Sequence, residues 1–208
     1  MCIRDRLSTL PAPELRAGLQ EAIKAGIIRD PGLFELLANR REAIFAGDPE
    51  ALAEVVTRSV RVKAEVVGAD EREGGLRMIL NLGHTLGHAI EAVTNYTQLL
   101  HGEAVAWGML AALHIARQRG VLGAQESERM DQVICLYGPL PPFQAAAQDL
   151  VARTARDKKN RGGTRSFVLP TCLGAAVVVT DVSVRELLEA AEQICLRARA
   201  AGQPTVNA

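Results

Sequence analysis

Aromatic residues are scarce in this sequence, at 3% of 208 residues, and its charges cancel, with 24 Lys and Arg against 24 Asp and Glu. So few rings argue against a surface that stacks nucleic-acid bases. A net charge of zero provides no field that would attract nucleic acid or an anionic membrane. We therefore expect neither partner. Apolar residues make up 48% of the chain, enough for a substantial core built from Ala, Leu, Val and Ile.

Motifs that would indicate disulfides, membrane spans or export are also missing. No stretch approaches the roughly 18 consecutive apolar residues of a membrane span, and residues 1–6 are too polar and short for a signal peptide. The four cysteines show no C-x-x-C spacing, which favours buried thiols in a reducing compartment; they are Cys2, Cys135, Cys172 and Cys195. The sequence predicts a soluble, cytoplasmic protein.

Helix signals dominate, because apolar residues recur at three- and four-residue spacing along most of the chain. Asp-Pro pairs at 30–31 and 48–49 resemble an N-cap before a first-turn proline, and Ser183-x-x-Glu186 is a capping-box pattern. The first expected helix begins near 13, with Gly26 as its stop or a weak point. Further helices are expected from 31, at 49–67, 76–93, 102–117 and 143–155, and from 184. Strand patterns occur at 166–169 and 176–179, on either side of Pro170 and Gly174. We predict a mainly α fold, a helical array with one small β-hairpin.

A polar stripe runs along the helix expected at 76–93. Residues spaced by threes and fours share a helical face, and here they are Arg77, Asn81, His84, His88 and Glu91. A stripe facing solvent is usually Lys and Glu, so this set favours the lining of a site over an exposed face with two incidental histidines. Gly83 and Gly87 in the same helix each cost about 1 kcal/mol relative to Ala, which indicates close approach of a backbone or ligand.

Metal binding is the chemistry that the histidines suggest. His101 directly precedes an apolar, and therefore buried, helix at 104–110. Catalytic zinc sites use three protein ligands, and two histidines with one glutamate is a known set. His84 and His101 supply the histidines, whereas His114 is interpreted as structural. For the carboxylate, spacing alone favours Glu103 first and leaves Glu21 as the other candidate.

Basic residues form a second candidate feature. Lys24, Lys63 and Arg77 could converge with the run at 157–161 on an anionic substrate. The alternative is that the run is an ordinary solvated loop.

These segments together resemble the 3-dehydroquinate synthase family. The resemblance is carried by NLGHTLGHAIE at 81–91 and HGEAVAWGM at 101–109, with ELRAGLQEAIK at 14–24, residues 63–81, and DKKNR at 157–161 leading into 167–170. It extends over roughly residues 8–200, which we expect to form the metal- and substrate-binding helical domain. Residues 1–7 are interpreted as a truncated or non-native start and 201–208 as a tail.

The resemblance implies roles for individual residues. Glu21, His84 and His101 would hold Zn²⁺ or Co²⁺, in preference to the local choice of Glu103. The substrate's hydroxyls and phosphate would contact four residues, namely Lys24, Lys63, Asn81 and His88. Its carboxylate would contact Arg77 and either Lys158 or Lys159.

The family's reaction converts 3-deoxy-arabino-heptulosonate 7-phosphate to 3-dehydroquinate and phosphate in the shikimate pathway, with a bound NAD⁺ that is reduced and then re-oxidised. Members are expected to be homodimers and to carry an N-terminal α/β nucleotide-binding domain. No glycine-rich phosphate loop after a strand occurs here, so we expect this chain to be inactive alone. The alternatives are another sugar-phosphate cyclase, of valiolone or deoxy-inosose type, and a non-catalytic metal-binding module.

Overall fold

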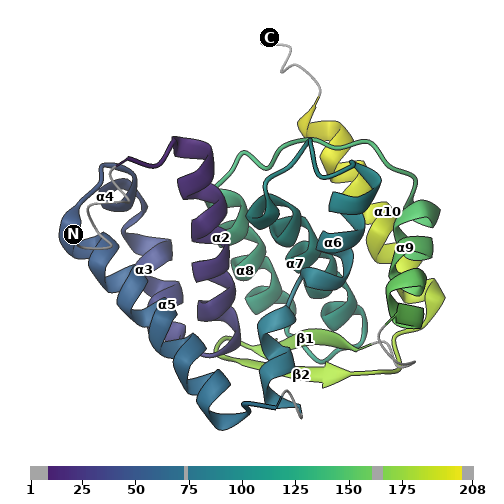
Figure 1. Ribbon diagram of the computed structural model, residues 1–208, viewed down its shortest axis with the longest axis horizontal. Helices are drawn as coiled ribbons and strands as arrows, with labels where there is room; N and C mark the ends of the chain where they lie inside the picture. The colour runs from purple at the N-terminus through teal and green to yellow at the C-terminus, as the bar shows by residue number, and fades with distance from the viewer. Residues whose placement is uncertain (1–8, 73–74, 161–165, 203–208) are drawn as a thin grey trace.

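The computed structural model describes residues 9–72, 75–160 and 166–202, and leaves the side chains of 156–160 undescribed. The helices are α2 (Ala12–Ile28), α3 (Pro31–Asn39), α4 (Arg41–Phe45), α5 (Pro49–Ala69), the 3₁₀ helix η1 (Leu76–Asn81), α6 (His84–Val93), α7 (His101–Gln118), α8 (Ala124–Leu136), α9 (Ala147–Asn160) and α10 (Val184–Ala201). The strands β1 (Phe167–Cys172) and β2 (Ala175–Val179) form one antiparallel hairpin (Figure 1). The predicted mainly α fold with a small hairpin is confirmed.

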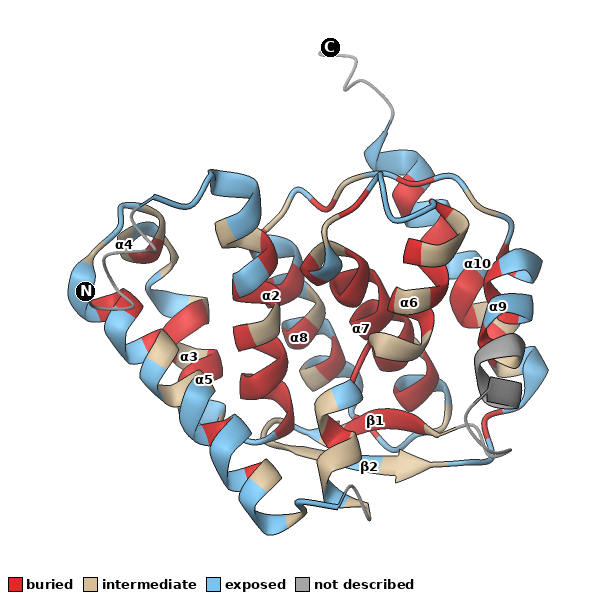
Figure 2. Ribbon diagram, viewed as in Figure 1, coloured by how far each residue is buried: buried red, intermediate tan, exposed pale blue. Residues whose placement is uncertain are grey.

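Helix α7 forms the centre of the molecule. Nearly every residue from Gly102 to Ala116 is buried (Figure 2). The helix packs against α2 and α6 on its two sides and also against α8, α10 and β1. Its sequence is apolar around most of its circumference, which is the pattern of a helix surrounded by protein. The burial predicted for 104–110 is therefore confirmed, and the neighbouring elements pack around α7.

Glycines bring the backbones of α6 and α7 into direct contact. A Cβ on Gly108 would lie 2.7 Å from the carbonyl carbon of Gly83, and one on Gly87 would lie 3.1 Å from the Ala104 oxygen. Neither helix could approach so closely with a larger side chain between them. This confirms the prediction that Gly83 and Gly87 mark a close backbone approach, and it explains why a glycine occurs at position 87, inside α6, where it disfavours the helix.

The single helix expected over 76–93 is wrong. The chain forms η1 and then α6, and Gly83 between them has a φ of +80°, a left-handed conformation that glycine adopts without strain. The Asp70 Oδ2 atom accepts hydrogen bonds from the amides of Gly75 and Arg77 and holds the start of η1. The five residues of the polar stripe therefore do not share one helical face.

Several smaller boundaries also differ from expectation. Helix α2 continues through Gly26 to Ile28. The glycine lets α3 pack closely against α2, since a Cβ at position 26 would lie 2.9 Å from the Phe34 amide nitrogen. Helix α9 starts at 147, since Phe143 is held in the core against the Trp107 ring with centroids 5.7 Å apart. Pro170 belongs to β1 and pairs with Ala176, rather than ending the strand.

Other sequence signals agree with the structure, with two omissions. Asp30 and Asp48 cap α3 and α5 as expected, and Ser183 with Glu186 forms the capping box of α10. Helices α4 and α8 were not predicted. Among the described residues, no helix is long and apolar enough to cross a bilayer.

Candidate metal and substrate site

Three histidines converge where α6 and α7 begin and meet. His84 is the first residue of α6, His88 lies one turn later, and His101 is the first residue of α7. The ring centroid of His84 lies 5.2 Å from the centroid of His88 and 5.2 Å from that of His101. The centroids of His88 and His101 are 5.9 Å apart. The close packing of α6 on α7 thus gathers residues that are 17 positions apart in sequence.

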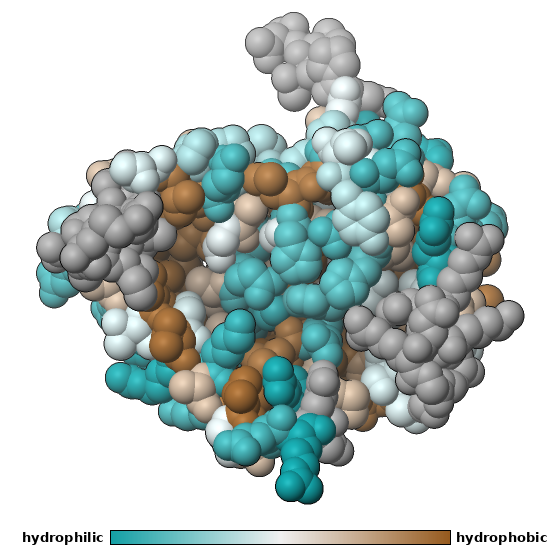
Figure 3. Space-filling model, viewed as in Figure 1, coloured by the Kyte–Doolittle hydropathy of each residue, from teal (hydrophilic) through white to brown (hydrophobic). Residues whose placement is uncertain are grey.

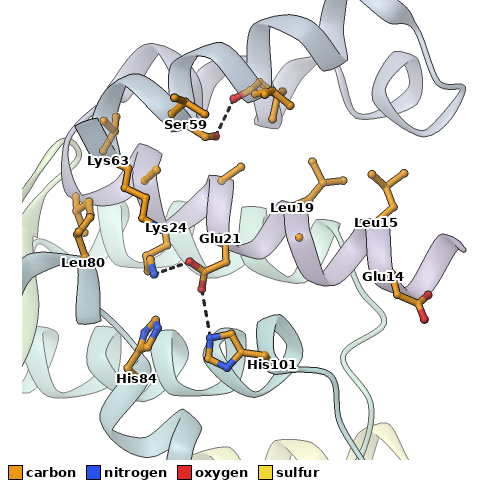
Figure 4. A pocket seen from close by; sticks show the side chains of 18 of the residues that line it. Glu14, Leu15, Leu19, Glu21, Lys24, Ser59, Lys63, Leu80, His84 and His101 are labelled. Atoms are coloured by element: carbon orange, nitrogen blue, oxygen red, sulfur yellow. Dashed lines mark hydrogen bonds and ion pairs between the residues drawn. The ribbon is translucent and has the colours of Figure 1, made fainter. Parts of the chain in front are cut away.

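Helix α2 adds a carboxylate to this cluster (Figure 4). The Glu21 Oε1 atom lies 3.9 Å from Nε2 of His101, and its Oε2 accepts a hydrogen bond of 2.6 Å from the Lys24 ammonium. One ligand atom from each of Glu21, His84 and His101 lies within 4.8 Å of the others. Their side chains come from three different helices, so only tertiary packing brings them together.

The Glu21 carboxylate has an unused oxygen on the side of the histidines. The side chain as a whole is 41% exposed, yet Oε1 is enclosed, and no donor among the described residues hydrogen-bonds to it. An enclosed, unpaired carboxylate oxygen is costly, and a cation beside two imidazoles would satisfy it. Two histidines and one glutamate are also a known ligand set for catalytic zinc. The residues present therefore fit a divalent metal.

The local preference for Glu103 as the carboxylate ligand is wrong. Its Oε2 accepts a hydrogen bond of 2.8 Å from the amide of Leu100, the N-cap residue of α7. A carboxylate at the third position of a helix commonly bonds back to the chain entering it, so Glu103 turns away from the histidines. Glu21, which the family resemblance favoured, is the residue that the structure places beside them.

Burial and neighbouring charge set the protonation of these groups. Burial, assisted by the charge of Lys24, lowers the pKa of His84 to about 4. The ring is therefore neutral at neutral pH and keeps a lone pair for a metal. Burial would raise the pKa of Glu21, but Lys24 and the histidines outweigh it and lower that pKa. Burial also lowers the pKa of Lys24, against the opposing effect of Glu21.

The second nitrogen of each candidate histidine ligand has a partner. Nδ1 of His84 lies 3.2 Å from the Leu82 carbonyl oxygen, and Nδ1 of His101 lies 3.1 Å from Oε1 of Glu91. His88, Glu91 and His101 form a second group whose ligand atoms could surround an ion. The sequence placed Glu91 on the polar stripe but assigned it no role. Its spacing, three residues after His88, was the available signal.

A cavity of about 730 Å³ opens beside the cluster. Its polar end contains Glu21, Lys24, Lys63, Arg77, Asn81, His84 and His101. The remaining wall comes mainly from α2 and α5 and is apolar except for Glu14 and Ser59. Figure 3 shows hydrophobic residues exposed along this hollow and a hydrophilic patch beside it. The volume suits a small-molecule ligand, and the basic side chains would favour an anionic one.

Of the other predicted site residues, some line this cavity and some do not. Arg77 and Asn81 line the cavity from η1 together with His84, whereas His88 does not line it, although its ring is adjacent to His84. The side chains of Lys158 and Lys159 lie outside the described residues.

Residues 18–160 match the model of the family described as 3-dehydroquinate synthase C-terminal. The chain belongs to this family. It is 49% identical over 185 residues to the 3-dehydroquinate synthase of Solibacter usitatus (strain Ellin6076), covering 88% of this chain and 52% of that one. The corresponding protein of Koribacter versatilis (strain Ellin345) is 44% identical over 187 residues, covering 90% and 51%. The chain thus spans about half the length of the curated relatives it matches.

Solved structures of related cyclases share the fold. The 2-epi-5-epi-valiolone synthase ValA from Streptomyces hygroscopicus subsp. jinggangensis 5008, with NAD⁺ and Zn²⁺ bound, superposes with a TM-score of 0.83 at 31% identity, covering 93% of this chain and 54% of that one. A 2-deoxy-scyllo-inosose synthase complexed with carbaglucose-6-phosphate, NAD⁺ and Co²⁺ gives 0.72 at 20% identity, covering 89% and 53%, and supports the fold alone.

Proposed function

We propose that this chain supplies the metal-binding and anion-binding groups of a 3-dehydroquinate synthase. The reaction is conversion of 3-deoxy-arabino-heptulosonate 7-phosphate to 3-dehydroquinate and phosphate, with NAD⁺ and a divalent metal, Zn²⁺ or Co²⁺. The observation that carries the proposal is the convergence of Glu21, His84 and His101 at the polar end of one cavity that also contains basic side chains. Residues 8–200 would form this functional domain.

Glu21, His84 and His101 would hold the metal. When bound, the metal supplies a Lewis acid that acidifies the substrate hydroxyl to be oxidised, and NAD⁺ supplies a temporary hydride acceptor. Lys24 holds one oxygen of Glu21 at 2.6 Å, so the other oxygen faces the two imidazoles. This ion pair orients the carboxylate before any ligand arrives.

The basic residues would bind and orient the substrate's anionic groups. Lys63 and Lys24 bring ammonium groups from α5 and α2 to the cavity, and Asn81 brings an amide from η1. Arg77 brings a planar guanidinium, whose paired donors match a carboxylate. His88 is proposed to contact the substrate from the edge of the cluster, and one of Lys158 and Lys159 to meet its carboxylate.

A second candidate function is another sugar-phosphate cyclase, of valiolone or deoxy-inosose type. The shared fold favours it, with TM-scores of 0.83 and 0.72. The first function has stronger support, because the curated 3-dehydroquinate synthases are 44–49% identical to this chain and those structures are 31% and 20% identical. A non-catalytic metal-binding module is the third alternative. A cytoplasmic homodimer that binds neither nucleic acid nor membranes completes the proposal.

Zinc titration calorimetry on the 208-residue chain tests the metal site. We expect one zinc per chain, and Glu21→Ala should weaken binding by more than about 100-fold, because changes outside the ligand shell already cost about 10–100-fold. Glu103→Gln is the control, since it removes the negative charge near His101 while keeping a side-chain oxygen that can accept the hydrogen bond from the Leu100 amide. Loss of zinc in Glu103→Gln, with retention in Glu21→Ala, would contradict the assignment.

The reaction is tested on the full-length protein. Release of phosphate from 3-deoxy-arabino-heptulosonate 7-phosphate, dependent on NAD⁺ and metal, is the expected result. Turnover of a different sugar phosphate alone would favour the second function, and zinc binding with no turnover would favour the module. NAD⁺ added to the 208-residue chain alone is expected to give no binding, since the described residues contain no glycine-rich turn between a strand and a helix.

A further inference from the structure

Glu91 is a carboxylate in a place where carboxylates are rarely found. It lies on α6 with only 9% of its surface exposed, packed toward the start of α7. A buried carboxylate requires a hydrogen-bonded partner, because the loss of hydration is otherwise uncompensated. The partner shown by the structure is the His101 ring, whose Nδ1 lies 3.1 Å from Glu91 Oε1.

The two nitrogens of His101 face two different carboxylates. Nδ1 is at hydrogen-bond distance from Glu91, whereas Nε2 faces the Oε1 atom of Glu21 at 3.9 Å. A hydrogen bond from Nδ1–H leaves the lone pair of the neutral ring on Nε2. The ring is therefore held with its metal-binding nitrogen toward Glu21 and its protonated nitrogen toward Glu91.

His84 is arranged in the same way by a different group. Its Nδ1 lies 3.2 Å from the Leu82 carbonyl oxygen, a backbone acceptor at the turn before α6. Both candidate ligands thus have an acceptor at Nδ1, one from the main chain and one from Glu91. Acceptors of this kind fix the tautomer and orientation of metal-binding histidines and increase their basicity.

We propose that Glu91 is a positioning residue that holds His101 in the Nδ1–H tautomer, with Nε2 directed at the metal. This inference rests on the metal site of the proposed function. It assigns Glu91 to orienting a ligand and excludes it as a ligand itself.

The competing arrangement is a second ion among His88, Glu91 and His101, whose ligand atoms also lie close enough. A neutral imidazole has one lone pair. Because the two nitrogens of His101 face opposite carboxylates, filling both groups at once would require a ring that has lost both protons. The group with Glu21 also contains the enclosed oxygen that lacks a partner among the described residues. The geometry thus favours one ion, with Glu91 as an acceptor.

Two substitutions at position 91 separate these roles. Glu91→Gln keeps an acceptor oxygen in the same place, whereas Glu91→Leu fills the space without one. We expect Glu91→Leu to weaken zinc binding by about 10–100-fold and Glu91→Gln by less than about 5-fold. Glu103→Gln is the control, because it removes a negative charge two residues from His101 without contacting either ring nitrogen. It should bind zinc as the parent chain does.

Two spectroscopic measurements distinguish positioning from a merely structural role. The ¹⁵N chemical shifts of the His101 ring in the metal-free chain should show the Nδ1–H tautomer in the parent and Glu91→Gln, and a mixture of tautomers in Glu91→Leu. The visible spectrum of bound Co²⁺ should be unchanged in Glu91→Gln. If Glu91→Leu does not fold, the parent and Glu91→Gln still test the tautomer.

Four results would overturn the proposal: an Nε2–H tautomer in the parent, full zinc affinity in Glu91→Leu, equal losses in both variants, or two zinc ions per chain. Equal losses or two ions would make Glu91 a ligand. Failure of the parent chain to bind zinc would instead reject the metal site of the proposed function, and the tautomer measurement would still report on the pairing of Glu91 with His101.

Discussion

Replacing Gly102 with alanine should disrupt both the fold and the proposed metal site, because this glycine lets α7 lie against α2. An ideal Cβ at position 102 would lie 2.6 Å from the carbonyl carbon of Ala17, and closer still to its oxygen. The obstacle is helix backbone, which cannot rotate away as a flexible side chain can. The substitution must therefore separate the helix that carries His101 from the helix that carries Glu21.

The size of the effect follows from these distances. Ordinary contact begins near 3.4 Å, so the carbonyl carbon alone requires a displacement of at least about 0.8 Å from 2.6 Å. Overpacking of this kind costs about 1–3 kcal/mol. In a helix interior, alanine is favoured over glycine by roughly 1 kcal/mol. Gly102 lies in the first turn of α7, so little of this gain would offset the cost of overpacking. Metal–ligand distances tolerate about 0.2 Å, so zinc affinity should fall by more than about tenfold.

Urea unfolding followed by circular dichroism measures the loss of stability, and zinc calorimetry measures the loss of affinity. Gly68→Ala in α5 is the matched control, since among the described residues no atom beyond its own stretch of helix backbone lies within 4 Å of its ideal Cβ. We expect it to be neutral or stabilising by up to about 1 kcal/mol. A Gly102→Ala chain that unfolds at the urea concentration of the parent and binds zinc equally well would refute the reasoning.

Two further predictions concern stability away from the site. The buried Tyr137 hydroxyl donates to the Leu37 carbonyl at 2.9 Å, so Tyr137→Phe should lower the unfolding free energy by about 1–2 kcal/mol by leaving that acceptor unpaired; an unchanged urea midpoint would count against this. Hydrogen bonds from Arg119 lower the pKa of Glu186 to about 2 from its ordinary value of 4.5. The resulting stabilisation, about 1 kcal/mol for a partly exposed pair, is present above pH 4.5 and is lost as pH falls toward 2. Arg119→Met should flatten this part of the stability–pH curve, and an unaltered curve would show that the ion pair contributes nothing.

Local patterns in the sequence predicted most of the elements, though not α4, α8 or the break at Gly83, and they suggested the kinds of ligand for the proposed metal site. The apolar run after His101 predicted a buried helix because no polar face exists to meet water. Ser183 and Glu186 predicted the start of α10 because their side chains bond to the free amides of the same turn. The proposal of imidazole ligands also came from the residue types alone.

Tertiary structure decided which residues meet. Spacing favoured Glu103 as the carboxylate because it is near His101 in sequence, but local backbone amides engage it, and the packing of α2 on α7 brings in Glu21, 80 positions away. The chain breaks at Gly83 where it lies against the backbone of α7, since a Cβ there would lie 2.6 Å from the Val105 oxygen, and no pattern within 76–93 shows this contact. The pairing of Glu91 with His101 needs both helices in place. Helical periodicity determines the direction in which a side chain points around the helix axis. Which residues of a neighbouring helix it meets is determined only by how the helices pack, here through glycines.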